Sequence, residues 1–250
     1  MCSSDLSMII WLPDHQVCFC GNLFSALFGH FPNLVTVRGD RYREALGFIE
    51  SLELVLALEP KLLLTGHHGP VVGKETIHEE LTRLRDAVRY VHDETVRGMN
   101  HGKDIHTLMR DIRLPPELEV GEGYGKVSWS VRAIWENYAG WFHHSSTTEL
   151  YPVPATSVHG DLVELAGGVE AVAQRAKDKL SADEPIEAIH LAEVALTAVP
   201  TNTAALEVMV AAHEQLERES ENFWLTQWLR KQLAHLRSTL EAAEAKERQS

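Results

Sequence analysis

The residues of this sequence best suited to chemistry are two adjacent histidines, His67 and His68, which lie between Gly66 and Gly69. The apolar residues 61–65 before them predict a short buried strand, and the glycines with Pro70 predict a turn at its carboxyl end. Reactive groups of α/β proteins tend to lie at that end of a strand. Neutral imidazole is a good zinc ligand. Taken alone, such a pair is more often a polar turn without a ligand, and a metal site is the alternative.

The segments around this turn predict an α/β arrangement. Residues 8–12 and 17–20 are apolar and predict two strands, with a turn at 13–16 between them. Residues 34–38 predict a further short strand. Asp40 is a plausible N-cap for the helix that follows, in which apolar residues recur every three or four positions until Pro60. Residues 74–98 carry one apolar stripe and predict a long amphipathic helix.

The rest of the chain predicts helices alone. A short helix is expected over residues 104–113, followed by a flexible glycine-rich loop at 121–125 and an aromatic segment at 127–142. Such aromatic density is typical of a core or an interface. Four further helices are expected at 161–180, 185–198, 203–216 and 222–246. Successive helical hairpins of this kind resemble tetratricopeptide packing. The predicted fold class is therefore α/β followed by all-α.

Composition narrows the classes of protein that fit this chain. The 250 residues include 23 Lys plus Arg against 36 Asp plus Glu, a formal charge of −13. This balance disfavours nucleic-acid binding, which needs a basic face. No apolar run approaches the ~20 residues needed to cross a bilayer. The three cysteines all lie in the first twenty positions, so a disulfide framework is excluded. Cys18 and Cys20 share one face of a predicted strand, where small buried side chains are favoured over a metal pair.

The first residues of the chain do not fit the pattern that follows them. One codon choice for residues 2–6 matches the end of a common sequencing adapter. We therefore expect residues 1–7 to be non-native and the natural protein to continue upstream, with an unusual but real N-terminus as the alternative.

Two separate segments resemble a known family. The first half of the chain resembles the second half of a metallo-β-lactamase fold. Within that superfamily, residues 32–39, Pro-Asn-Leu-Val-Thr-Val-Arg-Gly, are similar to a stretch of the linear alkyl sulfatases. Residues 124–135, Tyr-Gly-Lys-Val-Ser-Trp-Ser-Val-Arg-Ala-Ile-Trp, with Tyr-Ala-Gly-Trp-Phe at 138–142, are similar to the start of the alkyl sulfatase dimerisation domain. Gly-Gly-Val-Glu-Ala at 167–171 and Asn-Phe-Trp at 222–224 also fit.

This resemblance implies a domain organisation and a partner. Residues 8–100 would be the C-terminal part of a metallo-β-lactamase αββα fold, and residues 101–250 a helical, tetratricopeptide-like dimerisation domain. The helical domain would associate with a second copy as a homodimer, and no membrane span is implied. The substrate would be a small-molecule ester. The compartment stays open, with the cytoplasm favoured.

The resemblance also implies a metal site. The complete protein would hold two zinc ions, which lower the pKa of a bound water and polarise a sulfuric ester. His67 matches the last zinc ligand, with His68 as the competing register. Asn22 lies at the position of a bridging carboxylate, which is a departure because a neutral amide offers one good acceptor.

Substrate contacts are implied for Arg38 and Tyr124. The guanidinium of Arg38 could hold a sulfate through two parallel hydrogen bonds. Capping of local carbonyls is an equally good interpretation of Arg38. The family also has a His-Asn pair in the second segment, where the histidine is a proposed proton donor to the leaving group. Trp129 and Ser130 stand there instead, and an indole has no labile proton near neutral pH.

One absence in the sequence limits what this chain can do by itself. The first metal-binding cluster of the fold, His-x-His-x-Asp-His, occurs nowhere among the 14 histidines. We therefore expect this chain to be a fragment of a zinc-dependent hydrolase that is inactive alone. The alternatives are a helical dimerisation or binding module that has lost catalysis, and a metallo-hydrolase acting on another ester, such as a phosphate ester, a thioester or a lactone.

Overall fold

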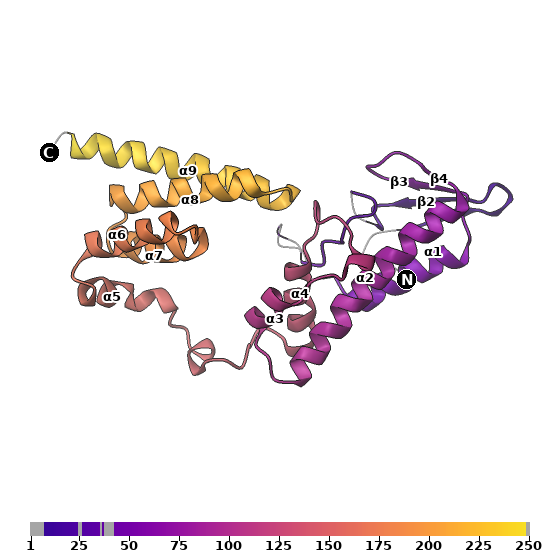
Figure 1. Ribbon diagram of the computed structural model, residues 1–250, viewed down its shortest axis with the longest axis horizontal. Coiled ribbons are helices and arrows are strands. Elements are labelled where there is room, and N and C mark those ends of the chain that lie inside the picture. The colour runs from indigo at the N-terminus through magenta and orange to yellow at the C-terminus, as the bar shows by residue number, and fades with distance from the viewer. Residues whose placement is uncertain (1–7, 25–26, 36, 38–42, 249–250) are drawn as a thin grey trace. The chain divides into compact units, whose positions relative to one another are not determined.

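The computed structural model describes residues 8–24, 27–35, 37 and 43–248 (Figure 1). The chain divides into two compact units, Met1–Glu149 and Leu150–Ser250. The first unit holds a small sheet with helices, and the second is helical. An α/β part followed by an all-α part is thus confirmed as the fold class. The division expected near residue 100 stays a prediction, because a compact unit and an evolutionary domain need not share a boundary.

The sheet of the first unit has four strands in the order β1-β2-β3-β4. They are β1 (Ile10–Leu12), β2 (Val17–Gly21), β3 (Leu62–Thr65) and β4 (Val71–Val72). The 3-10 turn η1 (Pro13–His15) joins β1 to its antiparallel neighbour β2. Strand β2 runs parallel to β3, and β4 returns antiparallel to β3. The parallel pair brings the carboxyl ends of β2 and β3 to the same edge.

Both faces of this sheet are apolar. Cys18, Cys20 and Leu63 point into the core and are fully buried. The alternate positions carry apolar side chains as well, and they are half-buried or exposed: Ile10, Leu12, Val17, Phe19, Leu62, Leu64 and Val72. Ile10 is 51% exposed and Val72 69%. Strands that are apolar on both faces are typical of a sheet covered on both sides.

Helices α1 (Ala45–Ala57) and α2 (Lys74–Asn100) pack together beside the sheet. The apolar stripe of α2 includes Ile77, Leu84 and Val91, which are buried in the same core as Cys18 and Leu63. Gly73 precedes α2 with a φ of 108°, a conformation that favours glycine. The expected helix at 74–98 is therefore present and slightly longer.

The first unit ends in short helices that pack on α2. They are α3 (Ile105–Asp111), the 3-10 turn η2 (Pro116–Leu118) and α4 (Val127–Ala139). Asp104 caps α3 by accepting a 3.0 Å hydrogen bond from the amide of Thr107. Helix α4 carries most of the predicted aromatic segment. Its Trp135 is buried with Val131 and Ile134, whereas Tyr138 and Trp141 are exposed.

The second unit is a stack of helical hairpins (Figure 1). After the 3-10 turns η3 (Thr147–Leu150) and η4 (Ala155–Val158) come α5 (His159–Leu165), α6 (Val169–Ser181), α7 (Pro185–Ala198), α8 (Thr203–Glu219) and α9 (Phe223–Glu247). Helix α6 packs on α7 and α8, and α8 packs on α9. The contact faces are rich in alanine, with Ala176, Ala192 and Ala205 fully buried. Small side chains of this kind allow helices to approach closely.

Two local predictions differ from the structure, and two others lie outside the described residues. The helix expected at 161–180 is two helices, because Gly167 and Gly168 have φ of 91° and 116° and break it between α5 and α6. Residues 34–38 were expected as a strand, but the described Leu34, Val35 and Val37 lie in no strand, and Leu34 is instead buried in the core. The expected helix start at Asp40 and the non-native residues 1–7 lie outside the described residues, and α1 begins at Ala45.

No helix among the described residues is long and apolar enough to cross a membrane.

Candidate functional site

The predicted metal-binding turn lies at the shared edge of β2 and β3. The register pairs Gly21 with Thr65, and the amide of Gly66 donates a 2.8 Å hydrogen bond to the carbonyl of Gly21. A Cβ on Gly66 would lie 2.6 Å from Oδ1 of Asn22, so the side chain of Asn22 lies directly against this glycine. The structure therefore brings Asn22 together with the turn that carries His67 and His68.

Both histidines of the turn are exposed, and hydrogen bonds orient His68. The backbone amide of His68 donates a 3.1 Å hydrogen bond to Oγ1 of Thr65, and that hydroxyl donates to the carbonyl of His68 at 3.1 Å. Nδ1 of His68 lies 3.1 Å from the carbonyl oxygen of Gly69. A carbonyl only accepts, so Nδ1 carries the proton and Nε2 has its lone pair available. Metal-ligating histidines are commonly oriented by such a bond.

The donor set of this edge does not fit a complete two-zinc site. No group of three or more His, Cys, Asp or Glu side chains that could hold a metal ion occurs among the residues that the structure describes. Structural zinc needs four protein ligands and catalytic zinc three. Asn22 with one or two histidines is too few, even if both imidazoles turn toward it.

The cysteines lie inside the core rather than at this edge. Cys18 and Cys20 are fully buried on β2, with their Sγ atoms 3.6 Å apart. The hydrogen bond from Cys20 lowers the pKa of the Cys18 thiol, against the opposing effect of burial. Neither is part of a disulfide among the residues that the structure describes. Their interpretation as small buried side chains agrees with this packing.

The two segments that carry the sequence resemblance lie against each other. The amide of Phe31 donates to the carbonyl of Gly121 at 2.7 Å, and the amide of Gly125 donates to the carbonyl of Phe31 at 3.0 Å. A Cβ on Gly125 would lie 2.0 Å from the carbonyl oxygen of Pro32. Tyr124 is half-buried within this contact. Arg38, the other predicted substrate contact, lies outside the described residues.

Each of these segments also holds a buried polar atom without a hydrogen-bond partner in the described structure. These atoms are Oδ1 of Asn33, a residue 5% exposed, and Oγ of Ser130, a residue 1% exposed. Trp129 is half-buried in the first turn of α4. An unpaired buried polar atom costs free energy, and such atoms in proteins usually have a partner. Both unpaired atoms thus belong to segments that carry the sequence resemblance.

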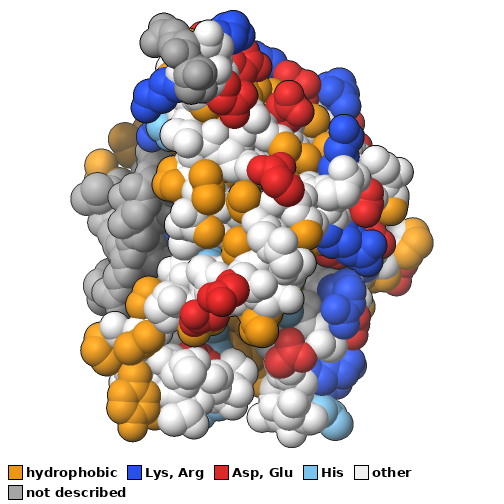
Figure 2. All heavy atoms as spheres, turned by 90° about the vertical axis from the view of Figure 1, so that its left-hand side faces the viewer, with side chains coloured by type: hydrophobic (Ala, Val, Ile, Leu, Met, Phe, Trp, Pro, Cys, Tyr) orange, Lys and Arg blue, Asp and Glu red, His pale blue; other side chains and the backbone are white. Residues whose placement is uncertain are grey.

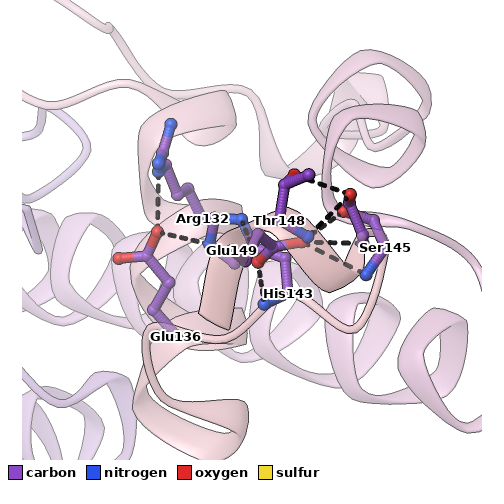
Figure 3. A network of polar contacts seen from close by, with 7 residues as sticks. Arg132, Glu136, His143, Ser145, Thr148 and Glu149 are labelled. Carbon is purple, nitrogen blue, oxygen red and sulfur yellow. Dashed lines mark hydrogen bonds and ion pairs between the residues drawn. The ribbon is translucent and has the colours of Figure 1, made fainter. Parts of the chain in front are cut away.

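A polar network follows α4 and orders the chain at the end of the first unit (Figure 3). Oε1 of Glu136 accepts from Nε of Arg132 at 2.8 Å and lies 3.2 Å from Nε2 of His143. Glu149 accepts from the amides of His143 and Ser146 at 2.7 and 3.0 Å, and from Oγ of Ser145 at 2.6 Å. These bonds, with that of Ser145 the largest contribution, lower the pKa of Glu149 to about 2. The network holds a turn and offers no open donor set for a metal.

Sequence reasoning missed two of these residues. His30 belongs to no motif in the sequence, but it contacts the glycine-rich loop through Nδ1, which accepts from the amide of Gly123 at 3.0 Å. No local pattern announces a contact across 93 positions. The role of Glu149 could have been found, because Ser-Thr-Thr-Glu at 146–149 has the sequence of a capping box. The carboxylate of Glu149 accepts from the amide of Ser146, and Oγ of Ser146 accepts from the amide of Thr148.

Comparison with known proteins identifies the family. A family model described as alkyl sulfatase dimerisation matches residues 104–239, more than half of the chain. The chain belongs to the alkyl sulfatase family. A linear primary-alkylsulfatase of Pseudomonas sp. (strain ATCC 19151) is 34% identical over 176 residues, which are 68% of this chain and 33% of the relative. The alkyl/aryl-sulfatase BDS1 of Saccharomyces cerevisiae is 28% identical over 221 residues, 86% of this chain and 34% of the relative.

Solved structures of alkyl sulfatases agree with the fold. The stereoselective inverting sec-alkylsulfatase Pisa1 from Pseudomonas sp. superposes with a TM-score of 0.79 at 25% identity, covering 94% of this chain and 37% of that chain. A double mutant of the same sec-alkyl sulfatase gives a TM-score of 0.84, covering 92% and 37%. The chain matches the C-terminal helical part of these structures together with a small sheet. It spans about a third of the length of the curated relatives that it matches.

Proposed function

We propose that this chain is the C-terminal part of a zinc-dependent hydrolase. Its substrates would be sulfuric esters, since its relatives are named alkylsulfatases. The observation that carries the proposal is the meeting of Asn22 and the His67-His68 turn at the carboxyl ends of β2 and β3. Carboxyl edges of parallel strands are where α/β proteins place reacting groups. His67 or His68 would supply one metal ligand, and the hydrogen bond of His68 to the carbonyl of Gly69 supports the second register.

The sheet supports the proposal that a further layer completes this domain. Its outer face presents Ile10, Phe19 and Val72 to solvent, and a sheet that is apolar on both faces is typical of a layered fold covered on both sides. In the αββα fold expected from the resemblance, a second sheet would cover this face. The remaining metal ligands would then come from that part of the polypeptide, since the described residues lack them.

The substrate contacts follow from the same arrangement. Arg38 and Tyr124 would bind the sulfate group, and the buried contact between residues 31–33 and 121–125 would position Tyr124. Trp129 cannot serve as a proton donor to the leaving group. The proposal therefore includes either a different proton donor or a substrate whose leaving group departs without a proton.

The metal site can be tested with paired variants of the full-length protein. Zinc retained after dialysis should fall in one of His67→Ala and His68→Ala and stay unchanged in the other, so that each variant controls for the other. A full-length protein that carries no His-x-His-x-Asp-His cluster and retains no zinc would contradict the proposal and favour a binding module. The 250-residue chain alone should not hydrolyse an alkyl sulfate, and turnover by it would show that it is complete.

We also propose that the helical part forms a homodimer in the cytoplasm. The matched family is described by dimerisation. Several large apolar side chains of the second unit are exposed, among them Leu165 at 85%, Ile186 at 51% and Phe223 at 51%. Figure 2 shows one face of the molecule, on which hydrophobic side chains lie in groups between charged ones. Light scattering should give about twice the chain mass of 28.0 kDa; a monomer with intact helix content would contradict the dimer.

A further inference from the structure

A second constellation of reactive side chains lies between α1, α2 and α4, away from the edge of β2 and β3. Nε2 of His92 lies 2.9 Å from the hydroxyl of Tyr138, and Nδ1 of His92 lies 2.8 Å from Oδ1 of Asp93. His92 is 9% exposed, whereas Tyr138 is 57% exposed. The imidazole is therefore fixed in the protein, while the phenol can meet a ligand.

The hydrogen-bond partners determine how the proton is placed. An ionised aspartate only accepts hydrogen bonds, so Asp93 holds the proton of neutral His92 on Nδ1. Nε2 is then an acceptor, and the hydroxyl of Tyr138 donates to it. This is the arrangement by which a carboxylate, an imidazole and a hydroxyl produce a nucleophile in hydrolases of unrelated folds.

The phenol opens onto a cavity of about 290 Å³. Its lining includes Ala45 and Leu46 from the first turn of α1, Ile134 and Asn137 from α4, and Glu44. In the described structure the N-cap residue Glu44 makes no side-chain hydrogen bond to that turn. The amides of the first turn of a helix have no partner within the helix, so they can stabilise a developing oxyanion.

We propose that Tyr138 is a nucleophile toward uncharged activated carboxylic esters, with His92 as its general base and Asp93 as the positioning residue. The phenolic oxygen bonds to the acyl carbon, the phenolic proton passes to Nε2 of His92, and the bond to the leaving phenolate breaks. The products are O-acyl-tyrosine and a phenolate, and His92 returns its proton to solvent. The carboxylate of Glu44 disfavours an anionic ester in this cavity, so a sulfate monoester is not the substrate of this site.

The test uses 4-nitrophenyl acetate and the 250-residue chain. Peptide mapping should find O-acetyl groups that hydroxylamine removes on Tyr138, formed at least about tenfold faster than on Tyr151, because a positioned base accelerates proton transfer by roughly 10²–10⁴-fold. Tyr151 is 64% exposed and serves as the reference within the same molecule. Equal acetylation of the two tyrosines would overturn the proposal.

Variants separate the roles of the three residues. Tyr138→Phe keeps the ring and should abolish the nitrophenolate burst. His92→Gln should slow acetylation of Tyr138 by about a hundredfold while that of Tyr151 is unchanged. Asp93→Asn should slow the acetylation of Tyr138 less than His92→Gln does. Asp93→Glu, which keeps the carboxylate, should acetylate Tyr138 at the rate of the wild type, which a merely structural role of Asp93 would not predict. If His92→Gln leaves the ratio of the two tyrosines unchanged in a chain with native helix content, the proposal is wrong.

Discussion

Nδ1 of His30 accepts a 3.0 Å hydrogen bond from the amide of Gly123, and this bond joins two segments that lie 93 positions apart. A backbone amide only donates, so neutral His30 carries its proton on Nε2. The same contact includes the amide bonds between Phe31 and the loop at 121–125. The two stretches that resemble the alkyl sulfatases therefore lie against each other in the structure.

Gly125→Ala should destabilise the first unit. A methyl group at this position would lie 2.0 Å from the carbonyl oxygen of Pro32 and 2.7 Å from the amide nitrogen of Asn33, and backbone atoms cannot move away cheaply. We expect a loss of about 1–3 kcal/mol in the free energy of unfolding, measured by urea denaturation. Gly69→Ala is the matched control, since no atom lies within 4 Å of its added Cβ. Equal stability of the two variants would contradict the close approach.

Local patterns in the sequence predict the elements better than they predict the contacts. The spacing of Ile77, Leu84 and Val91 predicts α2, and the apolar run before Gly66 predicts β3, because both patterns depend on near neighbours in the chain. The break at Gly167 was missed, since glycine also occurs inside helices. The role of Gly125 depends on Pro32, a residue far away in sequence, and no periodicity reports it.

The candidate site combines a local signal with a contact that depends on the fold. A turn with two histidines after a strand is a local signal, and the structure places it beside Asn22 as a parallel strand pair requires. The described residues hold no group of three or more possible metal ligands, so the zinc site stays a proposal. The array of His92 and Tyr138 joins residues 46 positions apart on two helices, and it becomes visible only after those helices pack.

The outer face of the sheet should make a fraction of the isolated chain aggregate nonspecifically, in addition to the proposed homodimer. Phe19 is 39% exposed in the centre of this face, between Ile10 on β1 and Leu64 on β3. Phe19→Ser should reduce both the aggregated fraction in size-exclusion chromatography and the binding of a hydrophobic dye, because it interrupts the apolar surface. Leu54→Ser is the control, at a 50% exposed position on α1. If both variants lower the aggregated fraction by the same amount, general surface hydrophobicity causes the aggregation rather than this face.

The thiols of β2 should resist alkylation in the folded chain. Cys18 and Cys20 are fully buried, so iodoacetamide should modify them at the rate at which the core opens, and denaturant should accelerate the reaction. Mass mapping distinguishes them from Cys2. The hydrogen bond from Cys20 lowers the pKa of Cys18, so Cys20→Ala should move the thiolate absorbance of Cys18 to higher pH. Rapid modification under native conditions would contradict the burial of this pair.

The carboxylate of Glu149 should make the end of the first unit sensitive to acid. Hydrogen bonds from Ser145 and from the amides of His143 and Ser146 lower its pKa from 4.5 to about 2. A lowered pKa in the folded state contributes stability that is fully present above 4.5 and is lost as the pH falls toward 2. The free energy of unfolding of the wild type should therefore exceed that of Glu149→Gln at neutral pH, and the difference should shrink between pH 4.5 and 2. Glu164→Gln, at an exposed carboxylate of α5, is the control and should show a smaller change over the same range. A difference that is constant with pH would mean that these hydrogen bonds do not depend on the charge of Glu149.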